Sequence, residues 1–400
     1  MMPLVKKYGI AAAASLRPTL VILGASGGVA RAFLQLLPSS RQAIAELVLI
    51  DKNDAVTRSA YLSHSNLAYT FIQADVNISL SAILMEVRSK SNFVIVLDLT
   101  DQTTHPILHA VDFHGINYIN CSLNAEVTTM VDYLPTIKEF EQKYQNGSHV
   151  LGVGMNPGIV NHMILGAIER YGVPKSFVEI EYDSAFPKID PGTPFITWSK
   201  RQFLGESVID NSGYCGEGGK YIELEKPPIS NPIPTQNHLS SLAVLDEYPL
   251  GMIVSHDEII ALSQHFGIPG QFIYAIHPLS LRRLQTIYFE RGTVDECDIS
   301  EIDNTTTHIS GSDRIGAWLN YEDRRVCWWC EVLHKNASGT NATLFMVAVG
   351  VLAHLLDYIQ AHPGKPGVTG VHDLNTTRLL CIVNQYMNIN EIVEDVVPCS

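Results

Sequence analysis

The fold of this chain is indicated most clearly by the segment Leu20-Val21-Ile22-Leu23-Gly24-Ala25-Ser26-Gly27-Gly28-Val29-Ala30. An apolar strand runs into a glycine turn and a helix, and a second apolar strand, residues 47–50, follows and ends at Asp51. Glycines at a strand-to-helix turn let the backbone approach a pyrophosphate, whose charge is met by free N–H groups and the positive helix end. The turn has the form GxxGxxA rather than GxGxxG, and its place between a strand and a helix predicts a dinucleotide-binding βαβ unit.

Asp51 indicates which dinucleotide binds. A carboxylate at the end of the second strand accepts hydrogen bonds from the ribose hydroxyls and repels a 2′-phosphate. The sequence therefore predicts NAD rather than NADP as the cofactor. The residues expected to contact it come from the glycine turn and from the ends of strands: Gly24, Ser26, Gly27, Gly28, Val29, Asp51, Asp98 and Asn156.

The composition of the chain indicates its domain count and the charge of its partners. Its 400 residues are 46% hydrophobic, and because single cores stop growing at about 250–300 residues, we expect two domains. The formal net charge of −14 disfavours nucleic acid and anionic membranes as partners, and it suits a small cationic substrate.

The order of strands and helices predicts an α/β protein with two domains. Strands and helices alternate through residues 1–155, which predicts a doubly wound parallel sheet, that is, a Rossmann-like NAD domain. From Phe177 the pattern changes to alternating strands, which predicts that residues 156–340 form a second, α+β domain for substrate binding and dimerisation. A long helix begins near Thr340, and residues 341–400 are expected to return to the NAD domain.

Other features bear on membranes, metals and location. The apolar stretch 344–356 is interrupted by Gly350 and His354 and is shorter than the roughly 18–20 residues that span a bilayer, so it predicts a buried helix.

The pair in Cys327-Trp328-Trp329-Cys330 has no second pair to complete a zinc site, so we expect core packing and no metal. Seven cysteines without a repeated spacing favour reduced thiols and a cytoplasmic protein. The sequon Asn341-Ala342-Thr343 is then expected to be a loop or a helix cap.

Polar residues just after the strands are candidates for the site, because ligands of parallel α/β sheets bind beyond the carboxyl ends of the strands. Asp98 and Asp101 follow the fourth strand, where the nicotinamide is expected, although both also suit turn capping. Asn156, in Gly154-Met155-Asn156-Pro157-Gly158, either lies beside the nicotinamide or caps the next helix. His256 follows another apolar strand and suits proton transfer near neutral pH, with a structural role as the alternative.

Three acids on one strand predict a bound cation. Glu179, Glu181 and Asp183 alternate, so they share one face of the strand, and like charges there are costly unless a positive group lies among them. The alternative is a solvated strand edge. Trp198 offers an indole face that attracts an ammonium group, and Glu206 lies eight residues further along the chain.

Taken together, these segments resemble the bacterial homospermidine synthase family of the saccharopine-dehydrogenase-like group. The resemblance spans most of the chain and is carried by motifs in a fixed order: residues 47–51, Asn156-Pro157-Gly158, Thr197-Trp198-Ser199 with Glu206, Val254-Ser255-His256-Asp257-Glu258 and Asn341-Ala342-Thr343. It implies the conversion of two putrescines into homospermidine and ammonia, with bound NAD acting first as oxidant and then as reductant.

The resemblance also implies roles for single residues. It makes Trp198 the aromatic group that holds the cation, and it makes Glu181 and Glu206 the carboxylates that grip amine ends. Asn156 and His256 become groups at the reacting carbon.

At the substrate entrance the resemblance implies a role for Asp101, but the chain departs from the family nearby. Asn120 and Asn124 stand where the family carries an Asp and a Glu, so either Glu126 takes over at the entrance or the entrance site differs from that of the family. The family further implies a homodimer formed mainly through the second domain.

Two alternatives stay open. A related reductive C–N ligase, such as carboxynorspermidine or saccharopine dehydrogenase, binds substrate carboxylates and needs inward arginines, whereas this substrate region is rich in acids. A catalytically silent NAD-binding protein would keep Asp51 but lose the distal groups, and here Trp198, Glu181 and Glu206 are all present.

Overall fold

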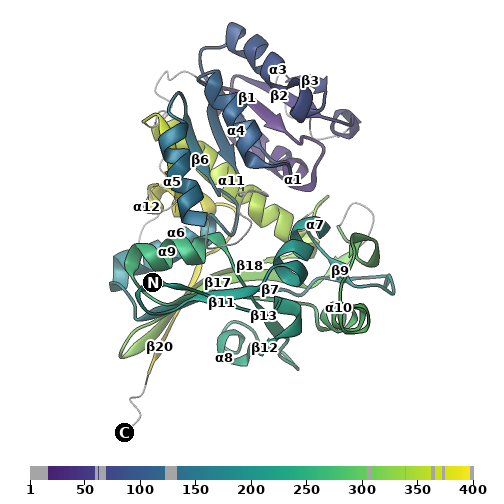
Figure 1. Cartoon of the computed structure of the whole chain (residues 1–400), viewed down its shortest axis with the longest axis vertical. Coiled ribbons are helices and arrows are strands. Elements are labelled where there is room, and N and C mark those ends of the chain that lie inside the picture. The colour runs from purple at the N-terminus through teal and green to yellow at the C-terminus, as the bar shows by residue number, and fades with distance from the viewer. Residues whose placement is uncertain are drawn as a thin grey trace.

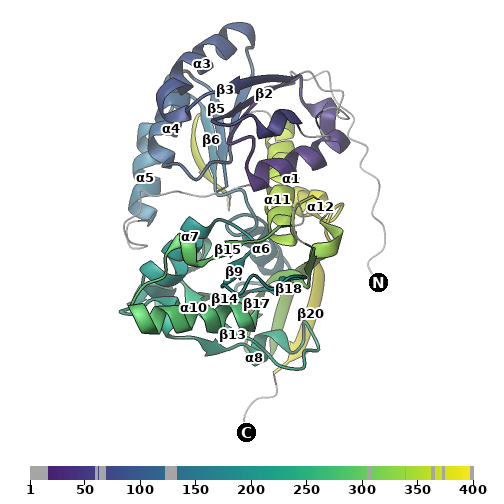
Figure 2. The same ribbon diagram turned by 90° about the vertical axis from the view of Figure 1, so that its right-hand side faces the viewer.

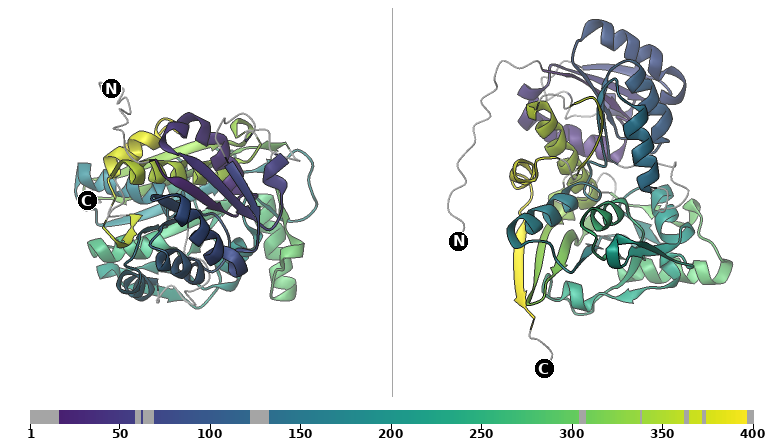
Figure 3. Two further views of the ribbon diagram at one scale, coloured as in Figure 1. Left: turned by 90° about the horizontal axis from the view of Figure 1, so that it is seen from above. Right: turned by 60° about the vertical axis from the view of Figure 1, so that its left-hand side comes forward.

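The computed structural model describes residues 17–58, 62, 69–121, 133–303, 308–337, 339–361, 365–371 and 374–396. Two sheets with their helices are stacked along the long axis of the molecule, the N-terminal sheet above and the second sheet below (Figure 1). The left panel of Figure 3 looks down on this stack, with the N-terminal strands in front of the second domain.

The N-terminal domain contains a seven-stranded parallel sheet in the order β3-β2-β1-β4-β5-β6-β19. The order 3-2-1-4-5-6 is that of the Rossmann fold, which confirms the predicted doubly wound sheet. Its strands are β1 (Thr19–Leu23), β2 (Glu46–Asp51), β3 (Tyr69–Gln73), β4 (Val94–Asp98), β5 (Asn117–Asn120), β6 (Ser148–Leu151) and β19 (Gly367–Gly370). The helices beside it are α1 (Gly28–Leu36), α3 (Val76–Lys90), α4 (Thr104–Phe113), α5 (Tyr133–Lys143) and α11 (Ala342–Ala361).

Alternate residues of β1 point to opposite sides of this sheet and enter different cores. Leu20 and Ile22 join the core that also contains residues of α1 and α11. Val21 and Leu23 pack instead with residues of α3 and α4. Because both faces of the strand are buried, it reads as a continuous apolar run rather than an alternating one.

The second domain is built on a mixed nine-stranded sheet centred on β7 (Ser176–Asp183). β14 (Gly270–Ile276) runs parallel to β7 on one side, and β17 (Ser312–Asn320) runs antiparallel on the other. The remaining strands are β10 (Ser212–Cys215), β11 (Tyr221–Leu224), β12 (Ile233–Pro234), β13 (Leu250–Val254), β18 (Arg324–Leu333) and β20 (Asn390–Asp395). The helices include α6 (Ile159–Tyr171), α7 (Lys200–Leu204), α9 (Asp257–Phe266) and α10 (Pro278–Arg291), and this mixture confirms the predicted α+β domain.

The C-terminal segment contributes to both domains. Its two expected helices are α11 and α12 (Thr376–Val383). β19 adds a parallel strand beside β6, whereas β20 pairs antiparallel with β18 at the edge of the second sheet (Figure 2). The segment expected to return to the NAD domain thus contributes β19 to the N-terminal sheet and β20 to the second sheet. The two strands are short, and their pairing with distant partners leaves no local pattern.

Helix α11 is the helix that the apolar stretch predicted. Of the described helices it alone is long and apolar enough to cross a membrane, and 89% of its most apolar window is buried inside the protein. It continues through Gly350, where a Cβ would come 2.1 Å from the Gly154 carbonyl oxygen. The missing side chain lets the loop after β6 pack directly on the helix.

The CxxC pair lies in β18. Cys327 and Cys330 are both buried, and because they are three residues apart on a strand they point to opposite faces and enter separate cores. The predicted core packing of this pair is confirmed.

Candidate active site

A cleft of about 970 Å³ opens between the two domains. One wall comes from the glycine turn and the ends of the N-terminal strands, and the other from β7, β14, α7 and the start of α9. Most of the predicted site residues line it: Gly24, Ser26, Gly27, Gly28, Val29, Asp51, Asp101, Asn156, Glu181, Trp198, Glu206 and His256. Glu126 and Asn124, from the predicted entrance, lie outside the described residues.

The glycine turn is shaped for close approach by a ligand. Gly24 has a φ of 71°, and a Cβ there would come 2.9 Å from the Leu99 carbonyl oxygen. Gly27 is the N-cap of α1 and has no side chain to cap it, which leaves the first amides of the helix, at Gly28 and Val29 in the cleft wall, available to an anion. A pyrophosphate fits this end of the cleft.

Asp51 lies beside this turn at the end of β2. Its Oδ2 accepts a hydrogen bond from the Ser26 N–H at 2.9 Å, and its Oδ1 accepts one from the Asn53 N–H at 3.0 Å. These two bonds fix the carboxylate in the cleft wall, and each oxygen retains a lone pair for a ribose hydroxyl.

Asp98 does not line the cleft, in contrast to the prediction that it contacts the cofactor. Its carboxylate is buried and accepts hydrogen bonds from the Tyr118 hydroxyl at 2.7 Å and from the Thr100 hydroxyl at 2.7 Å. Burial raises the pKa of Asp98. The turn-capping alternative describes this residue, whereas Asp101, three residues on, is exposed in the cleft wall.

Strand β7 is not a solvated edge. It is hydrogen-bonded on both sides, and Glu179, Glu181 and Asp183 are between 0% and 4% exposed. The three acids share one face, as predicted, but only Glu181 reaches the cleft. Glu179 and Asp183 belong to two separate buried clusters.

Glu181 is paired with Asn156 across the cleft wall. The Asn156 side-chain amide donates to Glu181 Oε2 at 2.8 Å. Burial raises the pKa of Glu181 to about 8, against the opposing effect of this hydrogen bond. Asn156 therefore orients a carboxyl group whose proton affinity lies in the neutral range.

Glu206 and His256 face each other in the same part of the cleft. Glu206 lies on a π-helical turn, Gly205–Ile209, and its side chain is 30% exposed into the cleft. Its Oε2 is 3.9 Å from His256 Nε2. Loss of solvent raises the pKa of Glu206 to about 7, which suits it to exchange protons at neutral pH.

His256 is held as a cation, and this corrects the expectation that it titrates near neutral pH. Burial by itself lowers the pKa of His256, but the Glu258 carboxylate, whose Oε2 is 2.5 Å from His256 Nδ1, outweighs burial and raises the pKa to about 10. At neutral pH the ring is therefore a donor, and the acceptor of a substrate proton has to be sought among the carboxylates.

Trp198 is oriented by a residue that the sequence did not single out. Its indole N–H donates to the Tyr274 hydroxyl at 2.9 Å, and its ring packs against Phe203 and Tyr274. Tyr274 stands opposite Glu181 in the β7–β14 pairing. No local pattern marks Tyr274, because only the pairing of two strands nearly a hundred residues apart brings it here.

Asp257 is a second residue that the sequence reasoning passed over, although it stands in the quoted motif. It lines the cleft, and burial raises its pKa to about 7. No group of three or more His, Cys, Asp or Glu side chains in the described ranges is arranged to hold a metal ion.

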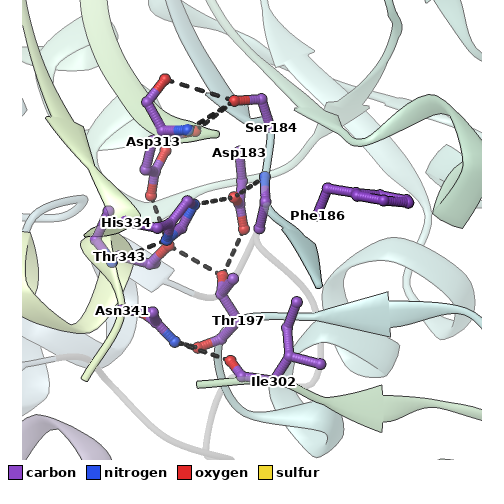
Figure 4. Close-up of polar contacts among 12 residues, drawn as sticks. Asp183, Ser184, Phe186, Thr197, Ile302, Asp313, His334, Asn341 and Thr343 are labelled. Carbon is purple, nitrogen blue, oxygen red and sulfur yellow. Dashed lines mark hydrogen bonds and ion pairs between the residues drawn. The ribbon is translucent and has the colours of Figure 1, made fainter. Parts of the chain in front are cut away.

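Behind the cleft, a buried polar cluster anchors the segment that carries Trp198 (Figure 4). Asp183 accepts hydrogen bonds from the Thr197 hydroxyl at 2.5 Å and from His334 Nε2 at 3.2 Å. His334 Nδ1 accepts from the Ala342 N–H at 3.0 Å, so its single ring proton lies on Nε2.

Asn341 completes this cluster as the cap of α11, which confirms the cap interpretation of the sequon. Its Oδ1 accepts from the Leu344 N–H at 2.9 Å, and its side-chain amide donates to the Thr197 and Ile302 carbonyl oxygens. Two segments nearly 150 residues apart are thereby joined directly beside Trp198.

Comparison with known proteins gives likeness in structure only. No protein-family model matches the chain, and no curated protein does. UDP-N-acetylglucosamine 3-dehydrogenase GnnA from Acidithiobacillus ferrooxidans is 11% identical, with 92% of this chain and 95% of that chain covered and a TM-score of 0.38. Amine dehydrogenase from Mycobacterium smegmatis is 10% identical, with 90% and 96% covered and a TM-score of 0.44. An NAD-binding oxidoreductase from Klebsiella pneumoniae is 10% identical, with 95% and 99% covered and a TM-score of 0.43. These proteins are named as oxidoreductases and not as homospermidine synthases, and at such identities the likeness does not extend to substrate.

Proposed function

We propose that the protein is an NAD-dependent enzyme that oxidises a diamine, and that its specific reaction is the formation of homospermidine and ammonia from two putrescines. One observation carries the proposal. A single cleft joins the glycine turn and Asp51 to the acids Glu181 and Glu206 and to the indole of Trp198.

Support for NAD comes from the upper wall of the cleft. The uncapped first turn of α1 suits the pyrophosphate, and Asp51, fixed by two backbone amides, suits the ribose and disfavours a 2′-phosphate. Bound NAD would supply a hydride acceptor and, later in the same turnover, a hydride donor.

Support for a diamine comes from the lower wall. Glu181, Glu206 and Asp257 are acids with pKa values raised to between about 7 and about 8, and an entering ammonium group would stabilise their charged forms. Trp198 adds an aromatic face for the same charge. Glu206, which faces the cleft, would bind the ammonium group that is oxidised and then take its proton, and Asn156 would keep the Glu181 carboxylate on the distal ammonium.

The acidic lining also separates this proposal from its nearest rivals. Arg201 is the sole arginine among the described residues that line the cleft, against several acids, and a substrate bearing carboxylates would need more. A silent NAD-binding protein would have no use for Glu181, Glu206 and Trp198 in one cleft.

We also propose a homodimer, as the resemblance implies. Support comes from β20, which forms the edge of the second sheet and carries the half-exposed Val393. Light scattering of the purified protein at micromolar concentration tests this, and a monomer mass would contradict it.

The reaction is tested by incubating the purified protein with putrescine and a catalytic amount of NAD. We expect homospermidine and ammonia in equal amounts, no net NADH, and tighter binding of NAD than of NADP. Asp51→Ala should narrow the difference between the two cofactors. Formation of NADH in proportion to the putrescine consumed, without homospermidine, would indicate that the protein is an amine dehydrogenase instead. No product from any diamine would contradict the proposal.

A further inference from the structure

We propose that Glu179 and Glu258 form a buried carboxyl pair that shares one proton, and that this pair holds His256 with Nδ1 protonated and Nε2 presented to the cleft. Neither glutamate lines the cleft, so both are positioning residues that act through His256. The Glu179–Glu258 pair does not depend on the proposed function. A role of His256 Nε2 in the reaction does rest on the proposed function.

The link between Glu258 and His256 is geometric. His256 is the N-cap of α9, and Glu258 lies in the first turn of the same helix. Glu258 Oε2 is 2.5 Å from His256 Nδ1, and the Glu258 side chain is 0% exposed. Phe272 packs edge-on against the imidazole with ring centroids 5.2 Å apart. The ring therefore has one orientation, in which Nδ1 donates to Glu258 and Nε2 faces Glu206.

The shared proton follows from what surrounds Glu179. This residue lies on β7 between Phe272 and Ala317 on the neighbouring strands. Both of its carboxyl oxygens, and Glu258 Oε1, are buried and accept no hydrogen bond of normal geometry in the described part of the chain. The Asn156 amide, which donates to Glu181, also acts on Glu179, but its effect on the Glu179 pKa is smaller than that of Glu258. The two carboxyl groups instead lie within hydrogen-bonding reach of each other. Two ionised carboxylates would repel, whereas one proton between them satisfies an oxygen on each.

The proton belongs on Glu179 and the charge on Glu258. Burial, followed by repulsion from Glu258, raises the pKa of Glu179 well above its usual value. Burial alone would also raise the pKa of Glu258, but the positive charge and hydrogen bond of His256 outweigh it and lower that pKa. The chain of groups is then neutral Glu179, charged Glu258 and protonated His256.

His256 has other acidic neighbours, and each has a different place. Asp257 is on its own helix, Glu206 faces it from the π-helical turn, and Glu181 acts on it from β7. Of these acids, Glu258 alone makes a hydrogen bond to the ring among the described residues. It is therefore the neighbour whose removal should change the proton affinity of His256 most.

The two glutamates give a matched pair of variants with opposite expected outcomes. A glutamine amide can replace a protonated carboxyl group, because it donates and accepts, but it cannot replace a carboxylate charge. Glu179→Gln should leave the titration midpoint of His256 close to that of the unmodified protein. Glu258→Gln should lower it by about 1–3 pH units, the usual effect of losing an opposite charge in contact.

The experiment is an NMR titration of protein labelled with ¹³C at histidine and at the glutamate carboxyl carbon, without NAD or amine. We expect the Glu179 carboxyl to be protonated at pH 7. We also expect the His256 midpoint to stay in place in Glu179→Gln and to fall in Glu258→Gln, while the circular dichroism spectra of both variants stay unchanged. An ionised Glu179 in the unmodified protein at pH 7 would overturn the pair even if Glu258→Gln failed to fold. Equal shifts of His256 in both variants would overturn it as well.

Activity then distinguishes this inference from the proposed function. If the protein oxidises diamines, the alkaline limb of kcat/KM should move to lower pH in Glu258→Gln and stay in place in Glu179→Gln. If no diamine is turned over but the NMR result is obtained, the pair stands and the proposed function fails.

Discussion

At the scale of single residues, the acids on the substrate side of the cleft carry a charge that depends on pH near neutrality. Glu181, Glu206 and Asp257 have pKa values raised to between about 7 and about 8 because protein replaces water around them. At neutral pH and without ligand, these acids are therefore partly protonated. A cation that enters must displace protons from them.

We predict that binding of a diamine releases protons to the buffer. Calorimetry at pH 7 in two buffers of different ionisation enthalpy should show release of about one proton per diamine, and affinity should rise as the pH increases from about 6 to about 8. The same titration with Glu181→Gln should release fewer protons per diamine. Binding heats that do not depend on the buffer would mean that these carboxyls are not the ammonium ligands.

Glu206→Gln should lower kcat/KM for the diamine by roughly ten- to hundredfold, because a hydrogen bond to a buried cation contributes about 1.5–3 kcal/mol. NAD affinity should stay unchanged, since Glu206 belongs to the second domain. Glu223→Gln is the matched control: this acid is exposed on β11, outside the cleft, and it bonds Asn211 at 2.8 Å. Equal activity in both variants would place Glu206 outside the chemistry.

Trp198 has two separable properties, an indole face and an N–H donated to Tyr274. A cation on an indole face contributes roughly 0.5–2 kcal/mol, so Trp198→Ala should lose most of the activity and Trp198→Phe should retain much of it. Tyr274→Phe removes the same hydrogen bond and keeps the indole, so it should resemble Trp198→Phe. The measurement is kcat/KM in the three variants. If Trp198→Phe and Tyr274→Phe are both as inactive as Trp198→Ala, the hydrogen bond between Trp198 and Tyr274, and not the ring face, is what matters.

At the scale of elements, the N-terminus of α11 decides where the Trp198 segment lies. Asn341 caps the helix and also donates to the carbonyl oxygens of Thr197 and Ile302. Both roles are buried, and the hydroxyl of Thr343 extends the same cluster to Asp313 at 2.6 Å. The helix thus fixes the segment through polar contacts on the side away from the cleft.

Asn341→Ala should therefore destabilise the protein by more than a cap alone, because buried carbonyl groups lose their donor at about 1–3 kcal/mol in addition to about 1 kcal/mol for the cap. Asn375→Ala is the matched control, since Asn375 caps α12 through the Arg378 N–H at 2.9 Å on an exposed helix end. Urea unfolding of both variants measures the difference. Equal loss of stability would show that the two carbonyl contacts contribute little.

At the scale of the whole molecule, the buried acids make folding depend on pH. The pKa of Glu181 is about 8 in the folded chain against 4.5 for a free side chain, so the folded state binds a proton that the unfolded state has released. Stability from such a group is present at low pH and is lost as the pH rises through the folded pKa. His256, with a pKa of about 10 against 6.5, acts with the same sign.

We predict that the melting temperature falls by a few degrees between pH 6.5 and pH 8.5. The window lies above most of the opposite contribution of His238 and His354, whose pKa values burial lowers to about 4, because that contribution arises mainly between pH 4 and the ordinary histidine pKa of 6.5. Glu181→Gln should reduce the slope. A melting temperature that is constant or rises across this window would contradict the raised pKa values of the cleft acids.

The N-terminal domain and the half of the cleft that it lines can be predicted from the local sequence. The glycine turn, the apolar strands and Asp51 form one local βαβ unit, and the physical requirement they meet, close approach of a backbone to an anion, is local as well. Residue type and resemblance also single out Trp198, Glu181, Glu206 and His256, and these four residues line the same cleft.

The proton affinities and hydrogen-bond partners of those residues depend on the tertiary structure. A proton affinity depends on burial and on charges brought in by other strands, so the sequence suggested that His256 titrates near neutral pH, whereas Glu258 makes it a cation. Asp98 follows a strand, the position at which ligand contacts are expected, but its carboxylate accepts a hydrogen bond from the Tyr118 hydroxyl instead of lining the cleft. Tyr274 lies in the site because β14 pairs with β7. Glu179 lies beside Glu258 because α9 packs against the same sheet. Contacts between distant segments set the dielectric and the hydrogen-bond partners of each group, and no local pattern contains them.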